Sequence, residues 1–155
     1  MDSFSFAFNQ FGYSLALITW LGCDFMSIVS APVIFRLSCS RELAGDLNGE
    51  IIKRLNRIKW AGVIIVGATV TLRFAKWDEE NATDLTRLAL LTLMGGAALL
   101  SASTISPLAR KARAYSRSRG SRDVQNNVAF RRLHGALMLM LLIEMTAGVS
   151  VWFFN

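Results

Sequence analysis

Two carboxylic acids interrupt long apolar stretches of this chain, Asp24 near its beginning and Glu144 near its end. An ionisable side chain at the centre of a bilayer costs ~2.5–3.5 kcal/mol or more, so such residues usually face a protein interior and often serve a function. No Lys or Arg lies within two helical turns of either acid along its own stretch. Since desolvation disfavours the anion, we expect one or both acids to be protonated at neutral pH.

Acids in this position have several possible uses. They can relay protons, bind a cation, or hydrogen-bond a pigment or quinone. They can also simply hold helices together, as a protonated acid does when it bonds to a hydroxyl or a backbone carbonyl. The hydroxyls nearest in depth belong to Thr19, Ser27 and Thr69.

His134, the only histidine, directly follows a basic stretch that includes Arg131 and Arg132. One histidine can supply a single axial ligand to chlorophyll or haem, or it can hydrogen-bond a neighbouring loop. Cys23 and Cys39 have no second Cys or His at ligand spacing, so we expect free thiols. Without a nucleophile–base pattern, a phosphate loop or a metal-ligand cluster, the sequence predicts no enzyme and requires no cofactor.

Long apolar helices must position these residues. Of the 155 residues, 53% are hydrophobic, which favours a membrane protein over a soluble domain of this size. A helix of ~20 apolar residues crosses the ~30 Å hydrocarbon layer. We therefore predict an all-α, integral membrane four-helix bundle forming one domain, with spans over residues 11–35, 60–74, 88–108 and 133–154.

Residues 41–59 have a different character from the spans. Their apolar side chains recur every three or four positions, which predicts an amphipathic helix along the membrane surface, with Ser40 as its N-cap. Such a helix can dock lipid or a partner, or can simply connect two spans.

Basic residues are distributed unevenly among the connecting segments. The first segment has six, the second three and the third eight, so the positive-inside rule places both termini outside and the first and third segments in the cytoplasm. Asp24 and Glu144 then both lie near the bilayer midplane. The third segment, a predicted loop over residues 109–132, favours contact with anionic lipid headgroups over nucleic acid. Residues expected to contact lipid or a partner are Arg54, Arg57, Arg110, Lys111, Arg113, Arg117 and Arg119.

Small residues recur within the predicted spans. They let a neighbouring helix approach closely, as membrane helix interfaces require. The expected packing positions are Gly22, Gly67, Gly95, Gly96, Ala97 and Gly135.

Three short patches resemble a known family. They are the Trp20–Gly22 and Ala31–Arg36 segments followed by Ala44 and Gly45, the Ser106–Pro107 pair, and the Arg132–Gly135 segment. Together they resemble the transmembrane-protein-205-like group of small four-helix membrane proteins of undefined function. The resemblance implies four membrane helices, with an Ala-Pro exit from the first and a His-Gly entry to the fourth. At Asp24 the family is ordinarily apolar.

Three functions are compatible with these features. The first is a non-catalytic subunit or scaffold of a larger membrane complex, for example a respiratory or photosynthetic one, in contact with lipids and other membrane subunits. The second is a small proton-coupled transporter or exporter that uses Asp24 and Glu144. The third is a pigment or haem carrier with His134 as ligand. In each case we expect a multi-pass protein of the plasma membrane or the bacterial inner membrane.

Overall fold

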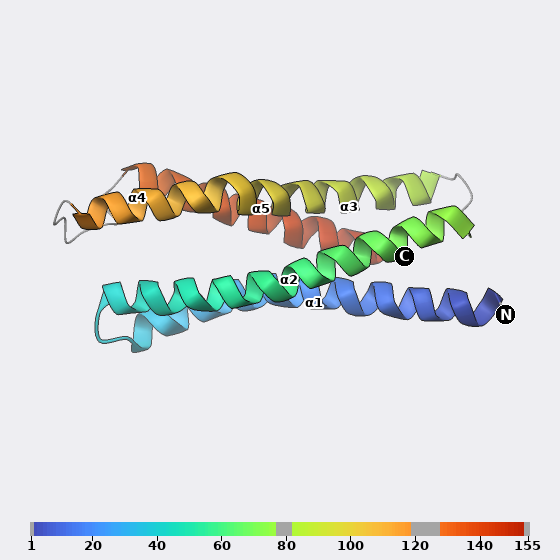
Figure 1. Cartoon of the computed structure of the whole chain (residues 1–155), viewed down its shortest axis with the longest axis horizontal. Helices are drawn as coiled ribbons and strands as arrows, with labels where there is room; N and C mark the ends of the chain where they lie inside the picture. The colour runs from blue at the N-terminus through green and yellow to red at the C-terminus, as the bar shows by residue number, and fades with distance from the viewer. Residues whose placement is uncertain (1, 77–81, 119–127, 154–155) are drawn as a thin grey trace. The chain divides into compact units, whose positions relative to one another are not determined.

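The computed structural model describes residues 2–76, 82–118 and 128–153, and nearly all of them are helical (Figure 1). Four helical stretches are long and apolar enough to cross a membrane, which confirms the predicted all-α class and the four apolar helices. The elements are α1 (Asp2–Leu37), α2 (Arg41–Lys76), α3 (Ala82–Leu100), the π-helical turn η1 (Ser101–Ile105), α4 (Ser106–Ser118) and α5 (Val128–Phe153).

The chain divides into two compact units. Unit 1 comprises Met1–Asp84 and contains α1 and α2, while unit 2 comprises Leu85–Asn155 and contains most of α3 together with η1, α4 and α5. Each unit is described by itself below.

Unit 1 is an antiparallel hairpin of α1 and α2. The chain reverses at residues 38–40, and the Leu43 N–H donates to the Ser40 Oγ at 3.2 Å. This bond satisfies one of the free N–H groups in the first turn of α2. The predicted N-cap at Ser40 is therefore confirmed.

The two helices of unit 1 meet along a narrow stripe. The two backbones approach closely at Gly62 of α2, because a Cβ atom there would lie 3.0 Å from the Ala16 carbonyl oxygen of α1. Small residues allow such backbone proximity between membrane helices. On α1 the buried residues recur every three or four positions and are Asn9, Tyr13, Ala16, Leu17, Trp20, Cys23 and Asp24.

Helix α2 runs without a break from Arg41 to Lys76. The prediction of a separate surface helix over 41–59 followed by a span over 60–74 is therefore wrong as far as the helix boundary is concerned. The segment around Lys59 contains no proline or turn signal, and helix propagation past a formed turn is favourable. A change in the polarity of the side chains alone does not end a helix.

In unit 2, α3, η1 and α4 form one continuous helical rod. The Ser106 N–H donates to the Ser101 carbonyl oxygen, five residues back, directly before Pro107. A proline removes one backbone donor and crowds the carbonyl of the preceding turn, and a widened π turn accommodates both effects. The predicted loop over 109–132 is thus helical up to Ser118, and α5 already begins at Val128.

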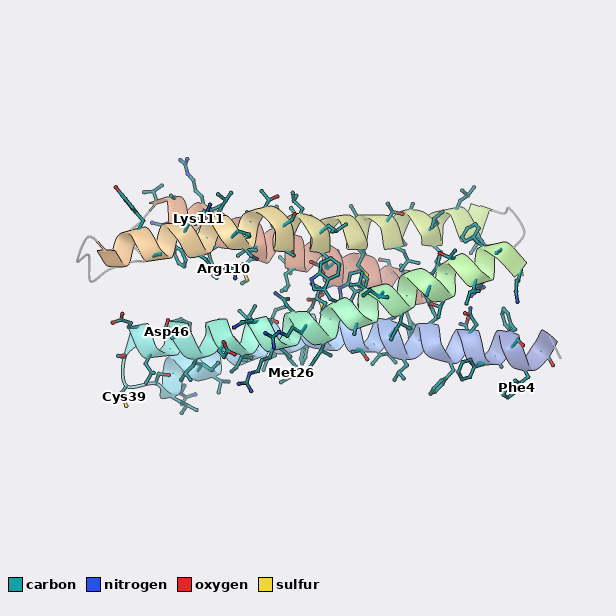
Figure 2. All side chains as sticks on the ribbon, in the orientation of Figure 1. Phe4, Met26, Cys39, Asp46, Arg110 and Lys111 are labelled. Atoms are coloured by element: carbon teal, nitrogen blue, oxygen red, sulfur yellow. The ribbon has the colours of Figure 1, made fainter. Side chains whose placement is uncertain are left out.

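Large apolar side chains cover much of the outer surface of each apolar helix. Phe4, Ile64 and Phe153 are 77%, 68% and 82% exposed, and Figure 2 shows Phe4 and Met26 on α1 pointing away from the helix axis. A soluble protein rarely exposes so much contiguous apolar surface. In a bilayer this is the surface that faces lipid.

Candidate functional site

A buried ion pair joins the two helices of unit 1. The Lys59 Nζ of α2 lies 2.8 Å from the Asp24 Oδ1 of α1, and the two side chains are only 8% and 2% exposed. The sequence argument missed this cation, because it considered only residues on the same helix as Asp24. Lys59 is 35 residues away in sequence and reaches Asp24 through the hairpin.

Further contacts follow the same interface toward the N-terminus of α1. The Asn9 side-chain amide donates to the Thr69 carbonyl oxygen at 3.1 Å. The Arg73 guanidinium donates to the Gln10 Oε1 at 3.0 Å and lies over the Phe6 ring, 5.6 Å from its centroid. Together with Gly62 and the ion pair, these contacts set the register of the hairpin from Phe6 to Asp24 on α1 and from Lys59 to Arg73 on α2.

The hydroxyls expected to bond the acids are used within their own helices. Thr19 donates to the Leu15 carbonyl at 2.8 Å, and Ser27 donates to the Cys23 carbonyl at 2.8 Å. Thr69 likewise contacts the Ile65 carbonyl at 2.9 Å. Such local bonds are the usual way for a membrane helix to satisfy a hydroxyl.

Glu144 lies on α5 in unit 2 and is 1% exposed. Ala147, Gly148 and Val151 are buried on the same helix, so the acid belongs to an inward-facing stripe. Asp24 lies in unit 1, and the predicted position of both acids near the bilayer midplane stays a prediction.

Two more charged residues are buried near the beginning of α3. Arg87 is 1% exposed and Asp84 is 8% exposed. The sequence argument assigned Arg87 to a connecting segment, as it did Lys59, because hydropathy ends a span at the first charge. Helical continuity is the signal that places both residues on membrane-length helices.

His134 is exposed on α5, and its ring stacks on that of Phe130 one turn earlier, with centroids 6.1 Å apart and an interplanar angle of 11°. A role as axial ligand stays a prediction. Cys23 is buried and Cys39 is exposed, and both are free, as expected. Within residues 2–76, 82–118 and 128–153, no group of three or more His, Cys, Asp or Glu side chains is arranged to hold a metal ion.

The glycine that makes the close helix contact in unit 1 is not among the glycines predicted to pack helices. Among the described residues, nothing lies within 4 Å of a Cβ built on Gly22, Gly67, Gly95, Gly96 or Gly135. Of the predicted positions, Ala97 is buried, with 6% exposure. The close contact belongs to Gly62, which the sequence argument missed.

The basic residues fall into two groups. On α2, Glu50 pairs with Lys53 at 3.6 Å and with Arg54 at 3.5 Å, and Arg57 is exposed. On α4, Arg110 and Lys111 are exposed and are labelled in Figure 2. The backbones of Arg113 and Arg117 are part of α4, but their side chains and the whole of Arg119 lie outside the described residues.

A family model for a domain of unknown function (DUF4149) matches residues 15–118, more than half of the chain. The matched region runs from α1 to the end of α4 and includes Asp24, Lys59 and Gly62, whereas α5 with Glu144 and His134 lies beyond it. Comparison with curated proteins and with solved structures gave no match.

Proposed function

We propose a function for this chain, which belongs to the DUF4149 family of domains of unknown function: it is a non-catalytic integral membrane subunit or scaffold of a larger membrane protein complex. Four apolar helices make the chain a multi-pass membrane protein. The finer proposal adds that both termini face out, that the membrane is the plasma or bacterial inner membrane, and that the chain is related to the transmembrane-protein-205-like group it resembles.

One observation supports the scaffold role most directly. The apolar helices carry glycines whose built Cβ has no side chain and no other helix of the same unit within 4 Å among the described residues, among them Gly67 on α2 and Gly96 on α3. A glycine on the surface of a membrane helix lets the backbone of a helix from another subunit approach closely, and this close packing stabilises helix association. These positions are therefore suited to binding a partner helix.

Gentle solubilisation followed by sizing and copurification tests this proposal. We expect the chain to elute in an assembly with other membrane subunits, and Gly67→Leu to release it by filling the contact surface. Ala68→Leu is the matched control, because Ala68 is also exposed but, as the next residue in the sequence, points to a different side of α2. A wild-type chain that elutes as a monomer and copurifies with nothing would exclude the scaffold role.

The second candidate is a small proton-coupled transporter, and the buried Glu144 favours it. If this acid carries protons, Glu144→Gln should abolish proton flux into vesicles containing the reconstituted chain, as measured with an enclosed pH-sensitive dye. Unchanged flux in a folded Glu144→Gln variant would exclude this function.

The proposed pigment or haem carrier depends on His134. An absorption spectrum of the purified chain tests it, and a colourless preparation would contradict a bound tetrapyrrole.

A further inference from the structure

Two exposed basic surfaces differ in how their charge is balanced. The surface of α2, formed by Lys53, Arg54 and Arg57, lies on a helix that also has exposed Glu42, Asp46 and Glu50. Glu50 pairs with both Lys53 and Arg54. Most of the positive charge on this surface is therefore compensated within the helix itself.

The basic end of unit 2 has no exposed acid of this kind among its described residues. It consists of the exposed Arg110 and Lys111 of α4 together with the exposed Arg131 and Arg132 at the beginning of α5, and these two helices contact each other. Among the described residues of unit 2, no acid precedes Glu144. Excess positive charge on one part of a protein disfavours the folded state through self-repulsion, and binding an anion offsets this effect.

The position of this basic end indicates which anion binds. The apolar stretch of the third spanning helix extends from Thr83 to Ala112, so Arg110 and Lys111 lie at its last turn. From Ala82 to Ser118 the continuous rod is about 55 Å long at 1.5 Å per residue, well beyond the ~30 Å hydrocarbon layer. The end of the rod therefore reaches the level of the headgroups.

Apolar side chains accompany the cations at this end. Leu108 and Tyr115 of α4 are 47% and 55% exposed, and Val128 of α5 is 60% exposed. A mixed surface of basic and large apolar side chains suits the boundary between headgroups and acyl chains, where the cation reaches phosphate and the apolar group enters the lipid. A soluble polyanion would leave these apolar groups uncovered.

We propose that the basic end of unit 2, and not the basic surface of α2, binds the headgroups of anionic phospholipids. This inference rests on the membrane location in the proposed function and identifies the lipid partner. The guanidinium and ammonium groups of Arg110, Lys111, Arg131 and Arg132 bind lipid phosphates, and Lys53 and Arg54 stay paired with Glu50.

The test uses the purified full-length chain in neutral detergent, titrated with a fluorescent phosphatidylglycerol or a fluorescent phosphatidylcholine. The test variant carries Arg110→Gln, Lys111→Gln, Arg131→Gln and Arg132→Gln. The control variant carries Arg36→Gln, Lys53→Gln, Arg54→Gln and Arg57→Gln, so both lose four exposed positive charges. At low salt we expect the test variant to bind phosphatidylglycerol at least about tenfold more weakly, while the control variant keeps most of its affinity.

Several outcomes would overturn the inference. They are equal binding of both lipids by the wild type, equal loss in both variants, and competition by inorganic phosphate at the concentration of the lipid. Folding of the test variant is checked by circular dichroism and sizing. A variant with Arg110→Lys, Arg131→Lys and Arg132→Lys keeps the charges and should retain binding. Since the lipid titration uses the purified chain alone, its result does not depend on copurification: a wild-type chain that copurifies with nothing excludes the scaffold role and leaves this inference intact.

Discussion

Asp24 and Lys59 stabilise each other within the α1–α2 interface. Burying two charges costs several kcal/mol per ion, and the mutual attraction at 2.8 Å offsets this cost only while both are present. Their contribution is therefore clearest when one partner is removed. Pairing at this site also favours one register of the hairpin over others.

We expect Lys59→Met to lower the free energy of unfolding by about 3–5 kcal/mol, because it leaves the Asp24 carboxylate buried without its cation. The double variant Asp24→Asn with Lys59→Met should recover most of this loss. Equilibrium unfolding in mixed detergent micelles measures the free energy of unfolding of the wild type, the single variant and the double variant. Lys53→Met is the control, since it breaks only an exposed pair with Glu50. If Lys53→Met lowered the free energy of unfolding as much as Lys59→Met, burial of the unpaired charge would not be the explanation.

Gly62 and Gly67 lie on the same helix but have different surroundings. A Cβ atom built on Gly62 lies 3.0 Å from the Ala16 carbonyl oxygen, whereas a Cβ atom built on Gly67 has no described atom from outside its own helix backbone within 4 Å. Overpacking of a tight contact costs about 1–3 kcal/mol. We therefore expect Gly62→Leu to destabilise the chain in the same unfolding assay and Gly67→Leu to leave its stability unchanged.

At the scale of elements, the hairpin register places exposed apolar residues of α1 beside the part of α2 that has exposed basic residues. Asn9 bonds Thr69 and Asp24 bonds Lys59, so the rest of α1 runs beside the first half of α2. There α1 exposes Met26 and Val29, while α2 exposes Arg54 and Arg57. This half of the hairpin is therefore amphipathic across two helices, and the predicted contact with the membrane surface involves both of them.

Cysteine labelling tests this arrangement in a chain whose native Cys23 and Cys39 are replaced. We expect Arg57→Cys to react with a membrane-impermeant thiol reagent, because a charged face lies in water, and Val29→Cys to be protected by lipid. Equal reaction at both positions would place this half of the hairpin in water. Protection at both would place it inside the bilayer or against a partner.

At the scale of the whole molecule, orientation depends on charge in the connecting segments. The first and third segments of the sequence argument have six and eight basic residues, against three in the second, and without the buried Lys59 and Arg87 the counts of the first, second and third segments are five, two and eight. We therefore predict that reporter fusions at either terminus report a non-cytoplasmic location. A cytoplasmic location of both termini would reverse the orientation, and opposite locations would contradict an even number of crossings.

The sequence was sufficient to predict the features that depend on local composition. Runs of apolar residues predicted the all-α class and four membrane-length helices, because each helix satisfies its own backbone hydrogen bonds in lipid. The Ser40 cap was also predictable, since its bond spans a single turn. Helix ends were not, because a charge such as Lys59 ends a hydropathic run without ending a helix.

Contacts between helices were decided only by the tertiary structure. Which cation neutralises Asp24 depends on the antiparallel register of α1 and α2, which brings together residues 35 positions apart. Which glycine makes a close contact depends on how each helix is rotated about its axis, and this separates Gly62 from Gly22 although both lie in apolar sequence. The physical reason is that hydropathy is a property of one residue and its neighbours along the chain, whereas pairing and close packing are properties of two surfaces brought together by the fold.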